Sequence, residues 1–249
     1  FLTDSVSGTG KELNSNNTNA QGTNANGITA FGADGFSVGT DGGVNGNTDT
    51  FVAWNWEAGG TASSNGDGTI TSSVSANTSA GFSIVKFEGD GNSSATVGHG
   101  LGVTPELIIQ KRLDSSTQGD WQVSVKDVGV GYLNFENALA TSFGSNGRLA
   151  YNTNTSTVYK FGAGSSDVTS VNTDGADYIA YCFLSVEGYS KIGSYTGNGD
   201  ADGISVHTGF RTCYLLIKAT SGTNSWCIYD TDRDTYNVAD DLLQAQDTA

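Results

Sequence analysis

Two stretches of the chain repeat one another, and this internal duplication limits the fold more than any single residue does. Residues 44–56 align without a gap on residues 171–183. The aromatic end of the first stretch, Phe51-Val52-Ala53-Trp54-Asn55-Trp56, returns in the second as Tyr178-Ile179-Ala180-Tyr181-Cys182-Phe183. Residues 81–111 likewise return as residues 188–218, each beginning with Gly, an aromatic residue and Ser. A repeat of this kind predicts an array of similar modules.

The spacing between the copies changes mainly at residues 59–80, which are rich in Gly, Ser, Thr and Asn and are replaced by residues 184–187 in the later copy. A module therefore ends in an aromatic strand and restarts at Gly-aromatic-Ser. The expected division is the C-terminal part of a preceding β module, a flexible linker, one complete β-sandwich module and the N-terminal part of a following module: residues 1–56, 57–80, 81–183 and 184–249.

Composition favours short strands over helices. Gly accounts for 35 of 249 residues, and Gly, Asn and Asp disfavour helix interiors, whereas Val, Ile and the aromatic residues suit strands. Strands are expected at residues 36–38, 49–56, 82–87, 106–111, 121–125, 132–135, 158–161 and 178–183. The expected fold class is all-β, with tandem antiparallel β-sandwich modules of the jelly-roll or concanavalin-like kind and a short helix at residues 239–245.

Residues 51–56 carry large apolar side chains on both faces, with Phe51 on one face and Trp54 and Trp56 on the other. This pattern is typical of a central strand in a sandwich. Because residues 178–183 repeat it, we expect the two stretches to occupy similar environments.

Charge and cysteine content limit the classes of partner and the cellular compartment that can be expected. The chain has 11 Lys plus Arg against 26 Asp plus Glu, a net charge of −15, which disfavours nucleic acid as a partner. No apolar run approaches the roughly 20 residues of a membrane-spanning helix, so no membrane insertion is expected. The three cysteines, Cys182, Cys213 and Cys227, match no zinc spacing and make no even disulfide framework. Reduced, buried strand cysteines are expected, which suits folding in a cytoplasm.

One turn offers a candidate metal site. Asn198, Asp200 and Asp202 place oxygen ligands at alternate positions, as calcium loops do, although a purely hydrophilic turn is the preferred interpretation. No cofactor other than calcium is suggested. The acidic alternation from Asp230 onward does not fit an EF-hand, because Thr235 stands where that loop needs glycine.

No catalytic residues are nominated, and the chain is not expected to be an enzyme. His99 and His207 occupy matching positions in the two copies, but neither has a recognisable nucleophile, and a histidine that ties a loop to a strand is preferred. Trp54, Trp56 and Tyr195 are candidate residues for binding a glycan or a surface. Trp121 and Trp226 align with each other, which favours a shared place in the core.

Three strings of the sequence resemble a known family. They are FVAWNWEAGG at residues 51–60, VGHGLGVTPE at residues 97–106 and GYSKIGSYTGNG at residues 188–199. These strings resemble the repeated β-rich modules of tail-fibre and other virion structural proteins of marine tailed bacteriophages. Cys213 and Arg211-Thr212 depart from the earlier copy, which has Glu106 and Thr104-Pro105.

The resemblance implies a lectin-like sandwich in a phage appendage that presents surfaces for assembly and host attachment, and it supplies no catalytic residues. The implied place is the virion, after folding in the host cytoplasm. The partners would be other virion proteins, copies of the chain itself in a homotrimer, and a host-surface glycan. Two alternatives stay open: a carbohydrate-binding adhesin module, which needs solvent-facing aromatics, and a polysaccharide depolymerase, which needs two carboxylates facing each other in a cleft.

Overall fold

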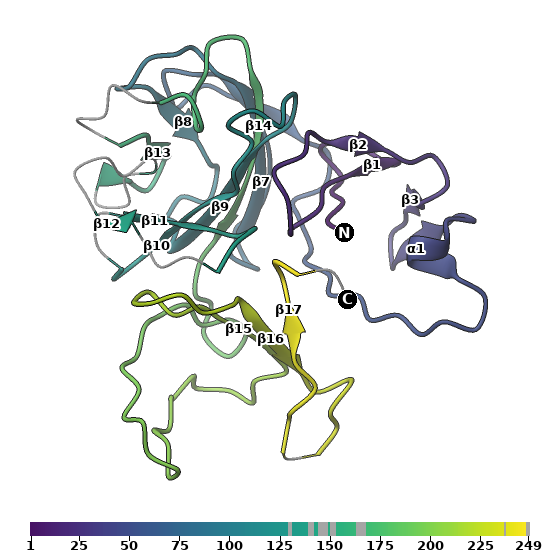
Figure 1. Ribbon diagram of the computed structural model, residues 1–249. Coiled ribbons are helices and arrows are strands. Elements are labelled where there is room, and N and C mark those ends of the chain that lie inside the picture. Colours follow the sequence, from purple (N-terminus) through teal and green to yellow (C-terminus); the bar gives the residue numbers. More distant parts are fainter. Residues whose placement is uncertain are drawn as a thin grey trace.

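The computed structural model of the protein describes residues 1–128, 131–138, 142–143, 149, 153–162, 168–236 and 238–247. The regular structure of these residues is almost entirely β (Figure 1). Its largest element is an antiparallel sheet of eight strands in the order β12-β11-β10-β9-β14-β7-β6-β5. In chain order these strands are β5 (Ser63–Asn65), β6 (Ser72–Asn77), β7 (Phe82–Glu88), β9 (Leu107–Arg112), β10 (Gln122–Val125), β11 (Gly131–Asn134), β12 (Ser142–Phe143) and β14 (Asp177–Phe183).

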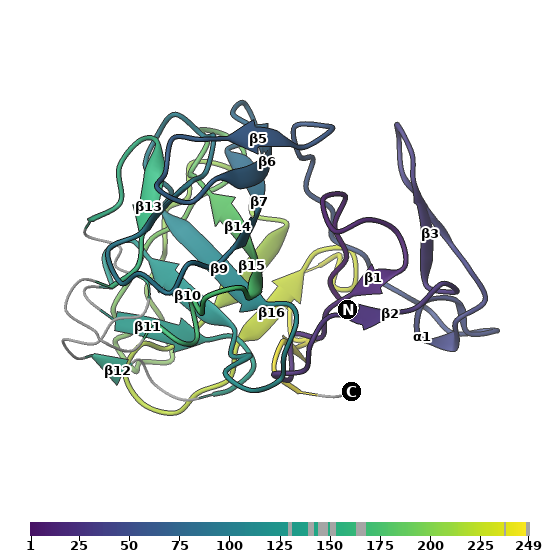
Figure 2. The same ribbon diagram turned by 90° about the horizontal axis from the view of Figure 1, so that it is seen from above.

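Smaller sheets surround this one. A two-stranded sheet of β8 (Thr96–Gly98) and β13 (Val158–Lys160) lies over one of its faces. The chain on either side of the eight-stranded sheet forms β1 (Lys11–Glu12), β2 (Gly22–Thr23), β3 (Ile28–Phe31), β4 (Phe36–Val38), β15 (Tyr214–Ile217), β16 (Cys227–Asp230), β17 (Leu243–Gln244) and the one-turn helix α1 (Gly42–Asn45). Viewed from above, the N-terminal strands and α1 stand to one side of the sandwich (Figure 2).

The eight-stranded sheet and the layer of β8 and β13 enclose the first hydrophobic core. Val85, Phe87, Ile108 and Tyr178 enter this core from the sheet. Val97, Leu101, Tyr159 and Phe161 are among the residues that face them from the covering layer. The all-β antiparallel sandwich expected from the sequence is confirmed.

The central strand β14 shows why this sequence forms such a sheet. It pairs with β7 on one edge and β9 on the other, so its backbone groups are bonded on both sides. Because side chains alternate across a strand, Tyr178 and Ala180 enter the first core, while Ile179 and Tyr181 enter a second core on the opposite face. The large apolar side chains on both faces of β14 are therefore buried, as predicted for residues 178–183.

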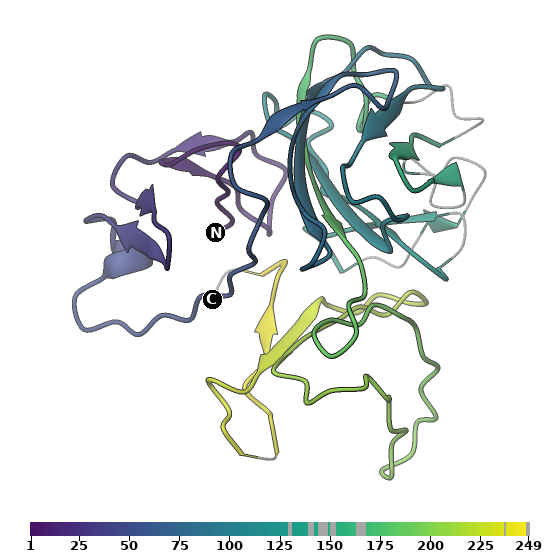
Figure 3. The ribbon, with the colours of Figure 1, turned by 180° about the vertical axis from the view of Figure 1, so that it is seen from behind.

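The second core joins the sandwich to the chain segments that precede and follow it. Trp121, Val123 and Leu133 of the sandwich pack there with Leu13 and with Trp226. We call residues 1–56 the leading part, residues 63–183 the central module and residues 188–249 the trailing part. In Figure 3 the trailing part lies below the central module, and the leading part lies beside it.

The prediction of a flexible linker at residues 57–80 is wrong. Residues 63–65 and 72–77 form β5 and β6, and β6 pairs with β7 along its whole length. The polar composition misled the sequence analysis because Ser72 and Ser75 are buried and each donates a hydrogen bond to a carbonyl, of Gly98 and Gly60 respectively. The central module therefore begins earlier than expected.

The expectation of similar environments for the two aromatic stretches is also wrong. Residues 51–56 form no strand, and Phe51 is 52% exposed whereas its counterpart Tyr178 is 0% exposed. A strand needs neighbouring strands to pair with. Residues 188–200 of the trailing part form no strand with which residues 51–56 could pair. The short helix expected at residues 239–245 is likewise wrong, because Leu243 and Gln244 pair with β16 instead.

Candidate assembly interface

The duplication seen in the sequence returns as a repeated three-stranded meander. β9, β10 and β11 of the central module correspond to β15, β16 and β17 of the trailing part, and both sets pair antiparallel in the same register. The matching rows across the strands are Ile109-Val123-Leu133 and Leu216-Ile228-Leu243. The meander of β15, β16 and β17 is therefore a structural copy of the meander of β9, β10 and β11.

The leading part contains part of the same element. Leu2 bridges to Leu13 as Ile228 pairs with Leu243 in the trailing part. The turn that follows is also the same. Oδ1 of Asp4 accepts from the amides of Val6 and Ser7. Oδ1 of Asp230 likewise accepts from the amides two and three residues further on. Asp230 thus closes a turn and also pairs with Arg233 at 2.7 Å.

The next hairpin shows that the leading part also matches the central module. Lys11 and Glu12 pair with Thr23 and Gly22. Gly131 and Tyr132 pair with Phe143 and Ser142 in the same way. Leu13-Asn14 therefore corresponds to Leu133-Asn134. This correspondence was missed in the sequence because few residues are shared, namely the dipeptide Leu-Asn, one further Asn and one Ala.

A tryptophan of each later copy binds the copy before it. Nε1 of Trp121 donates to the carbonyl of Asn14 at 2.9 Å, and Nε1 of Trp226 donates to the carbonyl of Asn134 at 2.9 Å. Both indoles are buried, as the alignment predicted. Phe135 packs edge-on against both rings, with centroids 6.0 and 5.0 Å away. The same donor therefore meets the same acceptor at both junctions.

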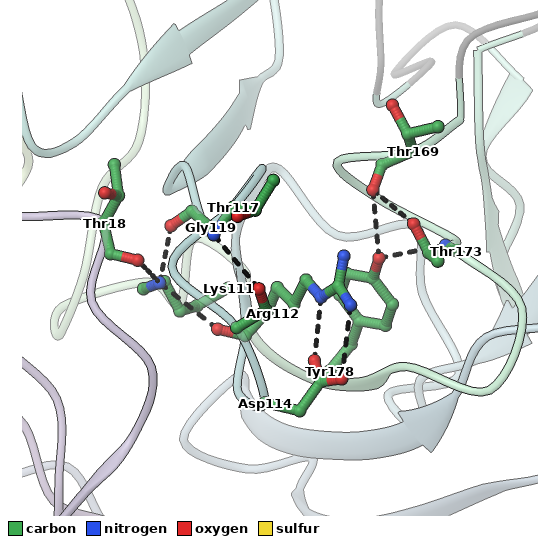
Figure 4. A network of polar contacts seen from close by, with 10 residues as sticks. Thr18, Lys111, Arg112, Asp114, Thr117, Gly119, Thr169, Thr173 and Tyr178 are labelled. Carbon is green, nitrogen blue, oxygen red and sulfur yellow. Dashed lines mark hydrogen bonds and ion pairs between the residues drawn. The ribbon is translucent and has the colours of Figure 1, made fainter.

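A lysine of the later copy also donates to a backbone carbonyl of the earlier copy (Figure 4). Nζ of Lys111 donates to the carbonyls of Thr18 at 3.1 Å, Arg112 at 3.2 Å and Gly119 at 2.5 Å. The ammonium also lies 5.9 Å from the centroid of the Trp121 ring. The side chain is almost fully buried, so three carbonyl acceptors replace the water that it loses.

The counterpart of Lys111 in the trailing part is Lys218. Its Nζ donates to the carbonyl of Ala138 at 3.4 Å and to that of Ala219 at 2.8 Å. Ala138 holds the place in the central module that Thr18 holds in the leading part. Each junction thus joins one Trp and one Lys of the later copy to two carbonyls of the earlier one, and we call this set of contacts the repeated junction.

Burial lowers the pKa of Lys111 to about 8, although Glu136 and Asp120 raise it in part. From about pH 8 to about pH 10 the unfolded chain keeps a proton that the folded chain has released, so stability should rise with pH. We expect the free energy of unfolding of the natural protein, minus that of Lys111→Met, to increase over this interval by at most about 1.4 kcal/mol per pH unit. Urea unfolding of both proteins across the interval measures this difference, and a flat or falling difference would contradict the assignment.

The candidate binding residues fall into two places. Trp54 and Trp56 lie together against Tyr214, with ring centroids 5.4 and 5.6 Å away. Trp54 is partly buried, whereas Trp56 is 42% exposed. Tyr195 is 51% exposed and lies in the irregular chain of the trailing part. No ring contact joins it to the tryptophans among the residues that the structure describes.

The candidate calcium turn is closed by its own hydrogen bonds. Asn198 accepts from the amide of Asp200 at 3.2 Å and donates to the carbonyl of Asp202 at 3.2 Å. Within the described ranges, no group of three or more His, Cys, Asp or Glu side chains is arranged to hold a metal ion. No helix in the described part of the chain is long and apolar enough to cross a membrane.

The two histidines differ in their surroundings. His99 is fully buried; Nε2 lies 3.2 Å from the carbonyl of Thr155, and Nδ1 accepts from the amide of Leu101 at 3.2 Å. Burial lowers its pKa, which the Thr155 carbonyl and Asp67 oppose. His99 therefore ties a loop to a strand, as the sequence analysis preferred, whereas His207 is exposed.

All three cysteines are free thiols, but only Cys182 is fully buried. The expectation of buried strand cysteines is wrong for Cys213, which lies exposed just before β15. Burial raises the pKa of Cys182 to about 12, so little thiolate forms at neutral pH. We expect Cys213 to react with an aromatic disulfide reagent at least about a hundredfold faster than Cys182 in the folded protein. Mass-spectrometric mapping of the labelled sites measures the two rates, and equal rates would contradict the buried position of β14.

Comparison with known proteins assigns the chain to a family. The fold is that of an all-β protein whose sandwich is flanked by partial copies of itself. The chain belongs to the family described as a domain of unknown function, DUF7483, whose model matches residues 1–249. No curated protein matches the chain. No solved structure matches it either.

Proposed function

We propose that the protein is a non-enzymatic structural protein of the virion, in a tail fibre or similar appendage of a tailed bacteriophage. The observation that carries this proposal is the repeated junction, in which Trp121 and Trp226 make the same bond to successive copies. Contacts that recur from copy to copy favour a mechanical role, because each added module would be held in the same way. The three sequence strings that resemble virion modules supply the phage assignment.

The proposed mechanism is assembly by stacking. Each module buries its own core, and its neighbour docks through one indole and one ammonium on backbone carbonyls, which do not depend on side-chain identity. The acidic surface, with a net charge of −15, would stay well hydrated and would disfavour unspecific association. We propose other virion proteins and further copies of the chain, in a homotrimer, as its partners.

A carbohydrate-binding role is the second candidate. Trp56 and Tyr195 are the observation in its favour, since both expose large aromatic faces that could stack on a sugar. In that case the appendage would contact a host-surface glycan directly.

Two experiments test these proposals. Mass spectrometry of purified particles of the virus that encodes the chain should detect it in stoichiometric amounts, and its absence from the particles would overturn the structural role. A glycan array with the purified protein separates the two candidates. We expect neither binding nor turnover if the role is structural alone, whereas binding that Trp56→Ala abolishes would favour the carbohydrate-binding role.

A further inference from the structure

Among the residues that the structure describes, no strand pairs with the outer edge of β15, whereas its counterpart β9 has one there. In the central module β9 lies between β10 and β14, whereas β15 forms one end of its three-stranded sheet. An edge strand presents unpaired backbone donors and acceptors, which can bind a further strand. The position that β14 occupies beside β9 is therefore open beside β15.

Residues that would line the missing contact are exposed. Leu215 of β15 is 40% exposed, while its counterpart Ile108 is 1% exposed in the first core. Phe51 differs from Tyr178 in the same way. Apolar positions that are buried in the complete copy thus lie open in both partial copies, one in the leading part and the other in the trailing part.

The segment that aligns with β14, residues 51–56, already lies next to this edge. Trp56 corresponds to Phe183, and Tyr214 corresponds to Leu107, which is the partner of Phe183 in the register of β14 on β9. The rings of Trp56 and Tyr214 are in edge contact, with centroids 5.6 Å apart. The two residues that would pair if residues 51–56 copied β14 are therefore already neighbours.

The faces also agree. In the central module Tyr181 and Ile109 enter the second core. Their counterparts Trp54 and Leu216 are packed against this same core. The side chains of residues 51–56 thus already alternate between the two faces as those of β14 do. Only the backbone hydrogen bonds to β15 remain to be formed.

A further contact places the leading and trailing parts together within one chain. Oγ of Ser15 donates to the carbonyl of Ala245 at 2.6 Å. Leu13 and Trp226 lie in the same core, so the leading part is held close to β15 by contacts independent of residues 51–56. A donor strand from the same chain is thus at a higher effective concentration than one from a second copy.

We propose that the outer edge of β15 is a docking site for a β-strand, and that its occupant is residues 51–56 of the same chain. The strand adds antiparallel in the register of β14 on β9, which pairs Asn55 with Leu215 and Trp56 with Tyr214. The leading and trailing parts then complete one another into a second sheet like that of the central module. This inference goes beyond the proposed function and does not depend on it.

Disulfide trapping tests the docked register. In a protein carrying Cys213→Ser and Cys227→Ser, the pair Asn55→Cys and Leu215→Cys should form a bond within one chain. The matched control combines Asn55→Cys with Leu216→Cys, where a shift of one residue places the side chains on opposite faces. We expect the first pair to close at least about tenfold faster than the control. Equal rates, or bonds formed only between chains, would overturn the proposal.

Hydrogen exchange provides a second test without engineered thiols. Proline has no amide donor. Val52 corresponds to Ile179, whose backbone faces β9, so the amide of Val52 would face β15 in the docked register and Val52→Pro should prevent docking. The outward amides of Tyr214 and Leu216 should then exchange about tenfold faster than in the natural protein, while those of residues 107–112 stay unchanged. Ala62→Pro, outside the docking strand, is the control and should leave Tyr214 and Leu216 protected. Unchanged exchange in Val52→Pro would overturn the proposal.

Discussion

Replacing Trp121 with alanine is expected to lower the free energy of unfolding by about 3–5 kcal/mol, the range for a fully buried large aromatic side chain. The indole is 0% exposed and packs edge-on against Phe135. Its loss would also leave the carbonyl of Asn14 without the donor that joins the leading part to the central module. Urea unfolding, followed by circular dichroism, measures the change.

Two matched variants separate the hydrogen bond from the burial. Trp121→Phe keeps an aromatic ring but loses the donor, and should cost about 1–3 kcal/mol. Trp56→Ala removes the same residue type from an exposed position and should cost about 1 kcal/mol or less. If Trp121→Ala destabilised the protein no more than Trp56→Ala does, the repeated junction would not be a structural contact.

Introducing a carboxylate at Val74 is the second substitution with a large expected effect. Val74 lies in β6, pairs with Val85 and is buried in the first core. A charge placed there finds no partner in an apolar core, and Val74→Asp should cost about 3–5 kcal/mol or unfold the central module. Thermal unfolding followed by circular dichroism detects either outcome.

The controls for Val74→Asp lie in the same segment. Val74→Ala removes two methyl groups without adding a charge and should cost about 1–2 kcal/mol. Ser64→Asp places the same carboxylate on the exposed strand β5 and should change stability by about 0.5 kcal/mol or less. Equal effects of Val74→Asp and Ser64→Asp would restore the original expectation that residues 57–80 are a linker.

The all-β class and most strands of the central module could be predicted, because the pattern of apolar residues shows which side chains are buried. Residues 178–183 alternate large apolar groups on both faces, and the structure places them between β7 and β9. The alignment of Trp121 with Trp226 gave two core positions correctly, because a tryptophan is a rare residue and its recurrence is specific.

Strand formation at residues 72–77 could not be predicted, because their polar side chains are buried through hydrogen bonds to backbone carbonyls. The sequence does not show that the carbonyls of Gly98 and Gly60 are the acceptors of these bonds. The strand prediction for residues 51–56 was wrong for the opposite reason. Their pattern is that of a strand, but pairing depends on partners elsewhere in the chain, and local propensity carries no information about them.

The repeated junction was also beyond the sequence analysis. Its donors, Trp121 and Lys111, are visible as aligned residues, but its acceptors are carbonyls of Asn14 and Thr18. A backbone carbonyl is present at every residue, so no residue type announces it. Only the register of β1 with β2 shows that these carbonyls occupy equivalent places in the leading part.

Exchange of the indole N–H protons tests the central claim most directly, because the claim is that one contact is used at both junctions. In ¹⁵N-resolved NMR spectra of the natural protein, the Nε1 protons of Trp121 and Trp226 should both be protected, and the Nε1 proton of the exposed Trp56 should exchange rapidly. Assignment requires only the four single Trp→Phe variants. Protection of Trp121 together with exchange of Trp226 as fast as that of Trp56 would show that the junction does not repeat.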